Sequence, residues 1–192
     1  MQRKVFGLPE SGFLFFFAFD YLSFIARKNP MAAVAAFRNA FGHGKWRGKV
    51  QLVIKTLNAD KAAAAASRLR RMLAEEPGVI LIEKTLSRTQ TLGLINACDA
   101  VVSLHRSEGL GLLVAEAMVL GKPVVCTDFG GTTDLINEMT GWPVRYETVP
   151  VKAGEYVQDA GQYWAEADID HAAGQMVEVA GDEDSRLRPT EL

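Results

Sequence analysis

The sequence predicts an α/β domain of Rossmann-like architecture, in which a parallel sheet carries helices on both faces. Three observations support this prediction. Short apolar runs rich in β-branched and aromatic residues alternate with longer helical segments along the chain. The first run, residues 13–19, is apolar at every position, as expected for a strand buried on both faces. The length of 192 residues suits one domain with a full hydrophobic core but is short for two.

The predicted strands are the short apolar runs. They cover residues 13–19, 50–55, 79–82, 100–104, 123–127 and, with a weaker pattern, 142–144. Connections between parallel strands are almost always right-handed, so the carboxyl ends of these strands should share one edge of the sheet. Ligands of open α/β sheets bind at that edge.

The predicted helices follow from capping signals and composition. Asn29 can cap a helix over 30–41, and Pro30 suits the first position of that helix. The segment 60–76 is rich in strong helix formers and stops before a Pro-Gly pair. Asp168 can cap a final helix. The remaining helices are expected at 89–98, 112–120, 132–139 and 169–180.

The region 147–167 has little periodicity and contains proline and glycine, so a long loop is expected there. The domain should cover residues 1–184, with 185–192 as a frayed polar tail. Residues 13–25 are very apolar, but Asp20 interrupts them and the run is shorter than the roughly 20 residues of a membrane span. No signal peptide or transmembrane helix is therefore expected.

Composition limits the class of ligand. Apolar residues make up 48% and charged residues 23%, and the formal charge is −2. No global basic field exists to attract nucleic acid, so any anion site must be local. Cys98 and Cys126 are expected to be reduced core thiols without a base beside them, which favours a cytoplasmic protein.

The segment 107–118 carries the strongest indication of a binding site, because it follows the predicted strand 100–104 directly. Gly109 and Gly111 remove side chains where the backbone turns into a helix, and the bare amides at a helix start attract anions. Glu116 lies in an otherwise apolar stretch of that helix. A buried unpaired carboxylate costs several kcal/mol. A pair of ligand hydroxyls would satisfy it, and a solvent-facing position is the alternative.

The same segment resembles a known family. Glu108 and Glu116 are separated by seven residues and flanked by Gly-Leu-Gly and Ala-Met-x-x-Gly-Lys-Pro-Val-Val, which resembles the E-x7-E segment of retaining glycosyltransferases of family 4. Those enzymes have the GT-B fold, of which this chain would be the C-terminal donor half. Residues 19–41, 102–109 and 164–173 also resemble parts of one branch, so the likeness runs from about residue 7 to about 184.

The resemblance implies roles for residues of this motif. Glu116 would accept hydrogen bonds from both ribose hydroxyls of the nucleotide, and Glu108 would contact hydroxyls of the donor sugar. The backbone at Gly109, with the amides of Leu110 and Gly111, would face the diphosphate or the sugar. In the implied reaction, cations and helix amides stabilise the diphosphate as it departs.

Arg27 and Lys28 are the cations implied for that diphosphate, with a solvated pair before a helix as the alternative. The chain departs from the family here. Most members place an arginine in a Gly-Arg-Leu string, and that position falls near Leu22, so Arg27 would have to substitute for it.

Further candidates lie at the same edge. His105 and Arg106 precede Glu108 and are either site residues or structural ones. Thr85 and Leu86 occupy the place where family members hold the base. The string 130–134 either faces the donor sugar or forms a capped turn.

Two Asp-x-Asp strings, 168–170 and 182–184, fall in a helix cap and in the acidic segment directly before the tail. Neither follows a strand, so no metal ligands and no permanently bound cofactor are expected.

The expected function is donor binding in hexose transfer from a GDP- or UDP-sugar, with retention of configuration. Mannose is one donor sugar expected for this branch. Transfer would need an N-terminal acceptor domain or a partner chain, and the acceptor would be a glycan or a lipid-linked glycan. The full enzyme is expected in the cytoplasm or at the inner face of the membrane. The alternative is a non-catalytic nucleotide-sugar-binding module or one subunit of a split enzyme. A nicotinamide-binding domain is not expected, because no G-x-G-x-x-G follows the first strand.

Overall fold

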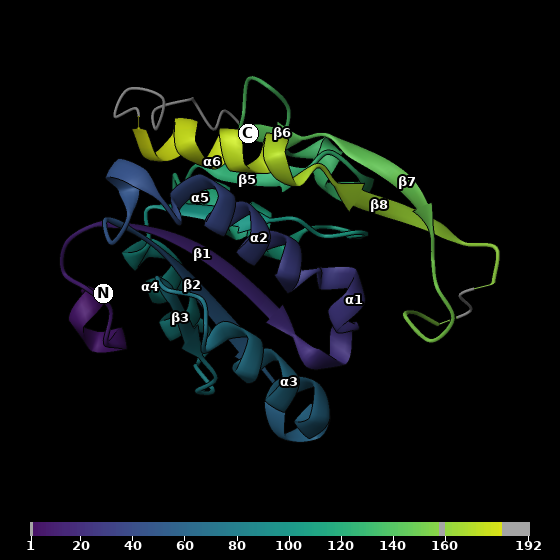
Figure 1. Cartoon of the computed structure of the whole chain (residues 1–192), viewed down its shortest axis with the longest axis horizontal. Coiled ribbons are helices and arrows are strands. Elements are labelled where there is room, and N and C mark those ends of the chain that lie inside the picture. Colours follow the sequence, from purple (N-terminus) through teal and green to yellow (C-terminus); the bar gives the residue numbers. More distant parts are fainter. Residues whose placement is uncertain (1, 158–159, 182–192) are drawn as a thin grey trace.

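The computed structural model describes residues 2–157 and 160–181. Six parallel strands form one sheet in the order β3-β2-β1-β4-β5-β6 (Figure 1). All five neighbouring pairs are parallel. The strands are β1 (Phe13–Asp20), β2 (Val50–Leu57), β3 (Val79–Ile82), β4 (Ala100–Ser103), β5 (Val124–Thr127) and β6 (Trp142–Val144). The predicted α/β fold class and all six predicted strands are confirmed.

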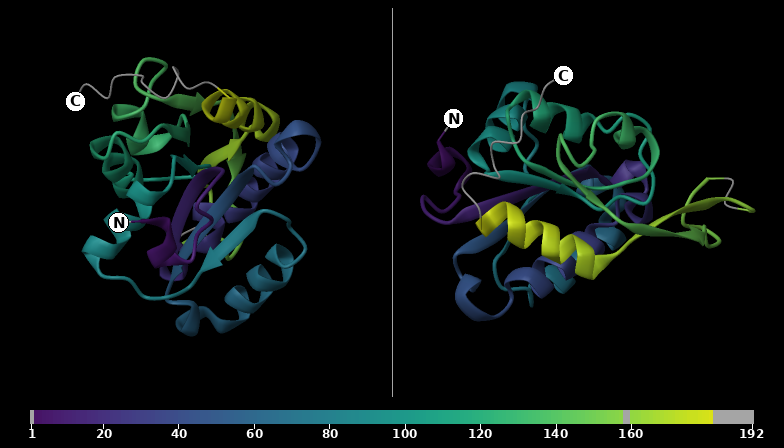
Figure 2. Two further views of the ribbon diagram at one scale, coloured as in Figure 1. Left: turned by 90° about the vertical axis from the view of Figure 1, so that its left-hand side faces the viewer. Right: turned by 90° about the horizontal axis from the view of Figure 1, so that it is seen from above.

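Helices cover both faces of the sheet (Figure 2). One face packs against α2 (Pro30–Phe41), α3 (Ala63–Leu73) and α6 (Ile169–Gly181). The other packs against α4 (Arg88–Ala97) and α5 (Leu112–Val119). The short helix α1 (Ile25–Lys28) joins the first strand to α2. The 3-10 turns are η1 (Arg3–Phe6), η2 (Tyr21–Ser23), η3 (Gly44–Trp46), η4 (Ala59–Ala62) and η5 (Gly130–Asp134).

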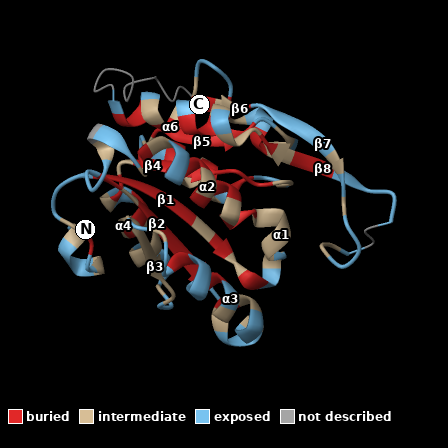
Figure 3. Cartoon of the chain, in the orientation of Figure 1, coloured by how far each residue is buried: buried red, intermediate tan, exposed pale blue. Residues whose placement is uncertain are grey.

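Strand β1 explains why the core has two halves. Its side chains alternate, so Phe15 and Phe17 enter the cluster with α2, α3 and α6, whereas Leu14 and Phe16 enter the cluster with α4 and α5. All four are at most 1% exposed, and the strand is buried along most of its length (Figure 3). Burying such a side chain contributes roughly 1.5–3 kcal/mol, so this apolar run secures the centre of the sheet.

The prediction of a long loop over 147–167 is wrong. Strands β7 (Tyr146–Pro150) and β8 (Tyr163–Ala167) form an antiparallel hairpin there. The hairpin projects from the body of the domain (Figures 1 and 2). Its base is anchored by the buried Trp164 and by the Ala165 amide, which donates to the Arg106 carbonyl at 2.9 Å. The anchoring partners are distant in sequence, which is why local periodicity did not reveal the strands.

Two predicted helix features are also corrected. Residues 132–139 do not form an α-helix, because the chain makes the 3-10 turn η5 and then a turn in which the Asn137 side chain accepts from the Met139 amide. Asn29 does not cap α2 with its side chain. Its backbone is left-handed, with φ of 52°, and its side-chain amide donates to Glu166 at 3.1 Å.

Helix α4 begins with a capping box that was not anticipated, formed by Ser87 and Gln90. The predicted cap of α6 is present, since Asp168 accepts from the His171 amide at 2.9 Å. The predicted frayed tail lies outside the described residues, as do Asp182 and Asp184 directly before it. Within the described part of the chain, no helix combines the length and apolar character needed to cross a membrane.

Candidate functional site

The strand order places a crevice between β1 and β4. The chain runs from β1 outward through β2 and β3, then returns to β4 on the other side of β1, so the connections diverge at this point. Ligands of doubly wound sheets bind in such a crevice, beyond the carboxyl ends of the strands. Arg27 and Lys28 follow β1, and Glu108 follows β4. The topology alone therefore brings these three residues to the same crevice.

The three side chains form one charged cluster. The Arg27 Nη1 lies 3.4 Å from Glu108 Oε1, and the Lys28 ammonium donates to Glu108 Oε2. Each side chain is less than a fifth exposed, at 16%, 19% and 17% respectively. Burial acts to raise the pKa of Glu108, but Lys28 and Arg27 outweigh it, and the pKa is lowered. Glu108 is therefore held as a carboxylate between two cations.

Backbone contacts fix the position of Arg27. Its guanidinium also donates to the Ser107 carbonyl at 2.9 Å and to the Ser23 carbonyl at 3.1 Å. Its own carbonyl accepts from the Arg106 amide at 2.8 Å, which ties α1 to the segment after β4. Leu22, near which the family's usual arginine position was expected, is 54% exposed. Arg27 rather than residue 22 thus supplies the guanidinium at the crevice.

A cavity of about 280 Å³ lies beside the cluster. Arg27, Lys28 and Glu108 line it together with residues from the start of α5, namely Leu110, Gly111, Leu112, Leu113 and Val114. Gly111 is the residue before α5 and has φ of 72°, a conformation that glycine adopts without strain. The positive end of α5 therefore faces the same cavity as the two cations, which favours an anionic ligand.

Glu116 lies about one turn further along α5, on the face that also carries Leu112 and Leu113. Its carboxylate is 15% exposed and forms an ion pair of 2.5 Å with Arg88 of α4, so the solvent-facing alternative does not hold. Arg88 is itself 71% exposed. Sequence reasoning missed Arg88. The Ser87–Gln90 capping box, which starts α4 at the same edge of the sheet, was the signal that could have found it.

Thr85 and Leu86 lie between β3 and α4, directly before Ser87. Thr85 is exposed, and Leu86 packs partly against the core beside α4 and α5. The ion pair between Arg88 and Glu116 connects this segment to α5. The structure thus joins the residues predicted for the base to the residue predicted for the ribose.

The loop after β5 holds the Glu108 loop in place by close backbone packing. The Gly131 amide donates to the Glu108 carbonyl at 2.9 Å. A Cβ atom built on Gly131 would lie 1.7 Å from the Gly109 carbonyl oxygen, and one on Gly130 would lie 2.7 Å from that of Glu108. Only glycine permits this approach, so both glycines position the glutamate rather than simply forming a capped turn.

His105 is fully buried behind this packing. Its Nε2 lies 3.1 Å from the Thr132 hydroxyl and 3.5 Å from the Cys126 sulfur. Burial lowers the pKa of His105 to about 4. The expectation that Cys126 has no base beside it is therefore wrong. Burial nevertheless raises the pKa of the Cys126 thiol to about 12, which opposes nucleophilic use. Both cysteines are buried free thiols.

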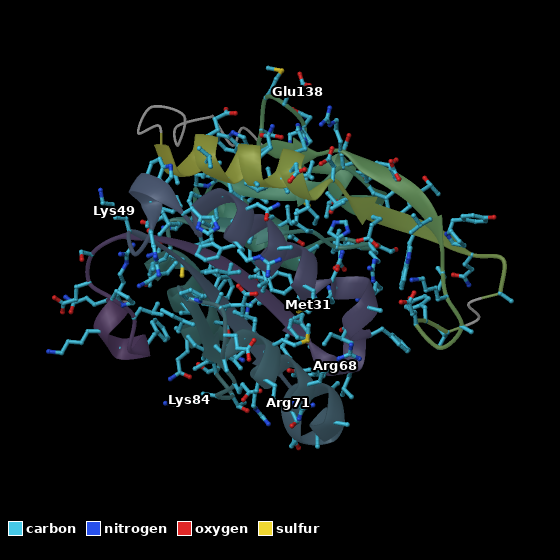
Figure 4. All side chains as sticks on the ribbon, in the orientation of Figure 1. Met31, Lys49, Arg68, Arg71, Lys84 and Glu138 are labelled. Atoms are coloured by element: carbon cyan, nitrogen blue, oxygen red, sulfur yellow. The ribbon has the colours of Figure 1, made fainter. Side chains whose placement is uncertain are left out.

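Arg106 joins three elements. Its Nε donates to Glu166 at 2.7 Å, its Nη1 donates to the Ala26 carbonyl at 3.0 Å, and its guanidinium carbon lies 5.2 Å from the centroid of the Trp164 ring. Arg106 is the one predicted site residue on the wall of a larger apolar cavity of about 460 Å³ between α1, α2 and α3. Met31 and Arg68, labelled in Figure 4, also line that cavity.

No cluster of three or more His, Cys, Asp or Glu side chains suited to a metal ion occurs among the residues that the structure describes. The expectation that neither Asp-x-Asp string follows a strand is wrong for the first one, because β8 ends at Ala167, directly before Asp168. Asp168 accepts from the His171 amide and forms an ion pair of 3.0 Å with Arg145.

Comparison with known proteins gives the family. The group 1 glycosyl transferases match this chain over residues 20–159. No curated protein sequence is similar enough to count as a match. The C-terminal domain of the group 1 glycosyl transferase LpcC from Francisella tularensis has a similar structure, with a TM-score of 0.67 and 16% identity over 98% of this chain and 85% of that one.

Two larger proteins share the fold. A UDP-forming trehalose-phosphate synthase from Burkholderia xenovorans has a TM-score of 0.69 and 12% identity, over 94% of this chain and 39% of that one. S. aureus TarM, solved with UDP, has a TM-score of 0.60 and 16% identity, over 94% of this chain and 31% of that one. This chain thus spans well under half the length of these two proteins, and its fold corresponds to the C-terminal half of a GT-B glycosyltransferase. With the family match covering most of its length, the chain belongs to the group 1 glycosyltransferases.

Proposed function

We propose that this chain is the donor-binding domain of a retaining hexosyltransferase of family 4. It would bind a GDP- or UDP-sugar, with mannose as one expected sugar, and act with an acceptor domain or partner chain that binds a glycan or a lipid-linked glycan. The enzyme would work in the cytoplasm or peripherally at the inner face of the membrane. The observation that carries this proposal is the convergence of Arg27, Lys28 and the amino end of α5 on one cavity, with Glu108 between the cations.

The roles follow from charge and position. A nucleoside diphosphate leaving group gains negative charge as the bond to the sugar breaks, and nearby cations and helix amides lower the barrier to that step. Arg27 and Lys28 would take the diphosphate, and the amides around Gly111 would support it. Glu108 would accept hydroxyls of the hexose while its charge stays balanced by the same two cations.

The nucleoside would extend from this cavity toward α4. Glu116 would accept the two ribose hydroxyls, sharing its carboxylate with Arg88, whose exposed side chain can move aside or remain. Thr85 and Leu86 would contact the base. The ion pair between Glu116 of α5 and Arg88 of α4 supports this order.

A second candidate function is a nucleotide-sugar-binding module without catalysis, or one subunit of a split enzyme. Donor binding is common to both candidates, and turnover in the presence of a partner chain separates them.

The ribose assignment is tested with Glu116→Gln. Calorimetric titration should show about tenfold weaker binding of nucleoside, monophosphate and diphosphate alike, because a carboxylate accepting hydroxyl hydrogen bonds contributes roughly 1.5–3 kcal/mol. Glu76→Gln is a matched control, since Glu76 is 14% exposed and also pairs with an exposed arginine. Equal affinities for Glu116→Gln and the native chain would contradict the ribose assignment.

The phosphate assignment is tested with Arg27→Ala combined with Lys28→Ala. This variant should lose far more affinity for the diphosphate than for the nucleoside, and added salt should weaken the native chain's diphosphate binding. The adjacent pair Arg70→Ala with Arg71→Ala removes the same charge from α3 and should leave affinity unchanged. Equal losses for all ligands in the first variant would show that Arg27 and Lys28 are structural.

A further inference from the structure

A second cavity, of about 210 Å³, adjoins the cavity beside Glu108. The two share Ala18, Ser23 and Lys28 in their walls. The second cavity lies at the ends of β1 and β2 and is also lined by Asp20, Lys55, Leu57, Phe19 and Thr91 of α4. It therefore continues the first cavity in the direction of α4, the side on which the nucleoside is proposed to lie.

Lys55 is a buried cation on the wall of this cavity. The residue is 3% exposed, and it stands opposite Ala18 in the register of β1 and β2. Its ammonium donates to the neighbouring Thr56 carbonyl at 2.5 Å. Among the described residues, no carboxylate lies within ion-pair distance of it.

Asp20, the acidic residue of the same cavity, is bound elsewhere. Its carboxylate accepts two hydrogen bonds from the Asn58 side chain, at 2.8 and 2.9 Å, and one from the Leu22 amide at 2.9 Å. Burial lowers the pKa of Lys55, and the charge of Asp20 acts in the opposite direction. Asp20 therefore offsets part of the charge of Lys55 without forming a direct pair.

A buried charge without a direct partner reduces stability. Replacing such a group by an apolar side chain of similar volume is often neutral or stabilising. Ala18, which stands opposite Lys55 in the sheet, and Leu57 line the same cavity, so the unbranched side chain of methionine suits the position. An ammonium has three donors and the Thr56 carbonyl takes one of them, so Lys55 can also bind an anion in this cavity.

We propose that Lys55 is a further diphosphate-binding residue, which contacts the donor from the floor of the second cavity while Lys28 contacts it from the wall between the two cavities. This inference rests on the proposed function. Lys28 lines both cavities, so an anion held by Lys28 lies at the entrance to the second one. Two ammonium groups and the amino end of α5 would then surround the diphosphate from different sides.

The diphosphate fits this position better than the other parts of the donor. The base and the hexose are neutral, and neither would balance a buried ammonium. The diphosphate carries the negative charge of the ligand and links the hexose, assigned to Glu108, to the nucleoside, assigned to Glu116. The second cavity shares Lys28 with the Glu108 cavity and is also lined by Thr91 of α4, so that link could pass through it.

The test is Lys55→Met, with Lys122→Met as the matched control. Lys122 is also partly buried, donates to the Asn96 carbonyl at 2.8 Å and has a pKa lowered by burial, but it precedes β5 at the opposite edge of the sheet. Calorimetry would use UDP and GDP, the two nucleosides and inorganic pyrophosphate. The thermal midpoint of each ligand-free variant would also be measured.

Lys55→Met should lower the affinity for UDP or GDP by about tenfold or more, the equivalent of about 1.4 kcal/mol. The affinity for pyrophosphate, where it binds, should fall by a similar factor. Nucleoside affinity should be unchanged, and the ligand-free midpoint should stay equal or rise. Lys122→Met should leave all affinities unchanged. Unchanged diphosphate affinity in Lys55→Met, or a lowered midpoint with equal losses for nucleoside and diphosphate, would overturn this inference alone. Failure of the native chain to bind any nucleoside diphosphate would overturn the proposed function and this inference together.

Discussion

Glu108 is bound by two cations of its own chain, and this pairing shapes the chemistry of the crevice. Arg27 and Lys28 hold it as a carboxylate, so it can accept sugar hydroxyls without adding net repulsion toward a diphosphate. A diphosphate would share these cations with Glu108. Each cation can make several hydrogen bonds at once, with five donors on the guanidinium and three on the ammonium. Sharing therefore requires adjustment of the side chains rather than loss of the cluster.

His105 gives the folded chain a pH dependence of its own. Burial lowers its pKa from 6.5 to about 4, so the unfolded chain binds a proton at a pH where the folded chain does not. Above pH 6.5, His105 is neutral in both states and does not change the free energy of unfolding. As the pH falls toward 4, protonation of His105 in the unfolded chain lowers the free energy of unfolding. The free energy of unfolding falls by about 3 kcal/mol over that pH interval. Urea unfolding of the native chain should therefore show lower stability at pH 4.5 than at pH 7.

His105→Asn should reduce this pH dependence, because asparagine does not titrate. His43→Asn is the control, since His43 is exposed on the chain surface. Comparing the free energy of unfolding of native chain and variant at each pH removes the contribution of the carboxylates. The same slope in His105→Asn and the native chain would show that burial of His105 does not set the acid sensitivity.

At the scale of elements, the close packing of two loops decides where Glu108 lies. The turn η5 meets the segment after β4 backbone to backbone, and the contact depends on Gly131. Gly131→Ala should lower stability and displace the Glu108 loop, because the added Cβ would lie 1.7 Å from the Gly109 carbonyl oxygen. Thermal unfolding should show a clearly lower midpoint, and nucleoside diphosphate affinity should fall with it.

Gly174→Ala provides the contrasting control. Gly174 lies within α6, and a Cβ there meets nothing within 4 Å. Alanine in a helix interior is favoured over glycine by about 1 kcal/mol, so this variant should be more stable than the native chain. A Gly131→Ala variant that kept the native midpoint would show that the loops separate at little cost and that the glycine does not position Glu108.

Local patterns predicted the elements whose signals lie within a few residues. The strand 13–19 was recognised from its unbroken apolar run, and α2 was predicted with its observed bounds from Pro30 at its first position, although the expected Asn29 cap is absent. The β7–β8 hairpin was missed because the buried Trp164 contacts Arg106, a partner far away in sequence. The turn η5 was predicted as a helix because its backbone packing against residues 108–109 leaves no local trace.

The candidate site shows the same division. Sequence motifs placed Arg27, Lys28, Glu108 and Glu116 at one sheet edge, but not their partners. The pairing of both cations with Glu108, and of Glu116 with Arg88, depends on how β1, β4 and α4 meet. The same holds for Lys55, whose burial depends on the sheet and on α4. Such side-chain pairings arise from tertiary packing, which no short motif encodes.

At the scale of the whole molecule, the carboxyl edge of the sheet remains open to solvent. Leu22, Phe24 and Leu110 are exposed around the crevice, at 54%, 39% and 63%. The cavities beside Glu108 and Lys55 are lined by the groups proposed for the donor. In an active complex, a second surface would have to cover this edge, bind the acceptor and exclude water from the hexose.

We therefore expect this chain to bind nucleoside diphosphates without transferring sugar by itself. Binding should persist in EDTA, with affinity within tenfold of that in magnesium or manganese, because Arg27, Lys28 and the α5 amides supply the positive charge. Calorimetry in both buffers measures the binding. Incubating radiolabelled UDP- or GDP-sugars with glycan and lipid-linked acceptors measures the transfer, and adding a candidate partner chain should restore it. Multiple turnovers by the chain alone onto any acceptor except water would contradict the requirement for a second surface. A larger loss of affinity in EDTA would instead show that a metal ion shares the charge of the diphosphate with the two side chains.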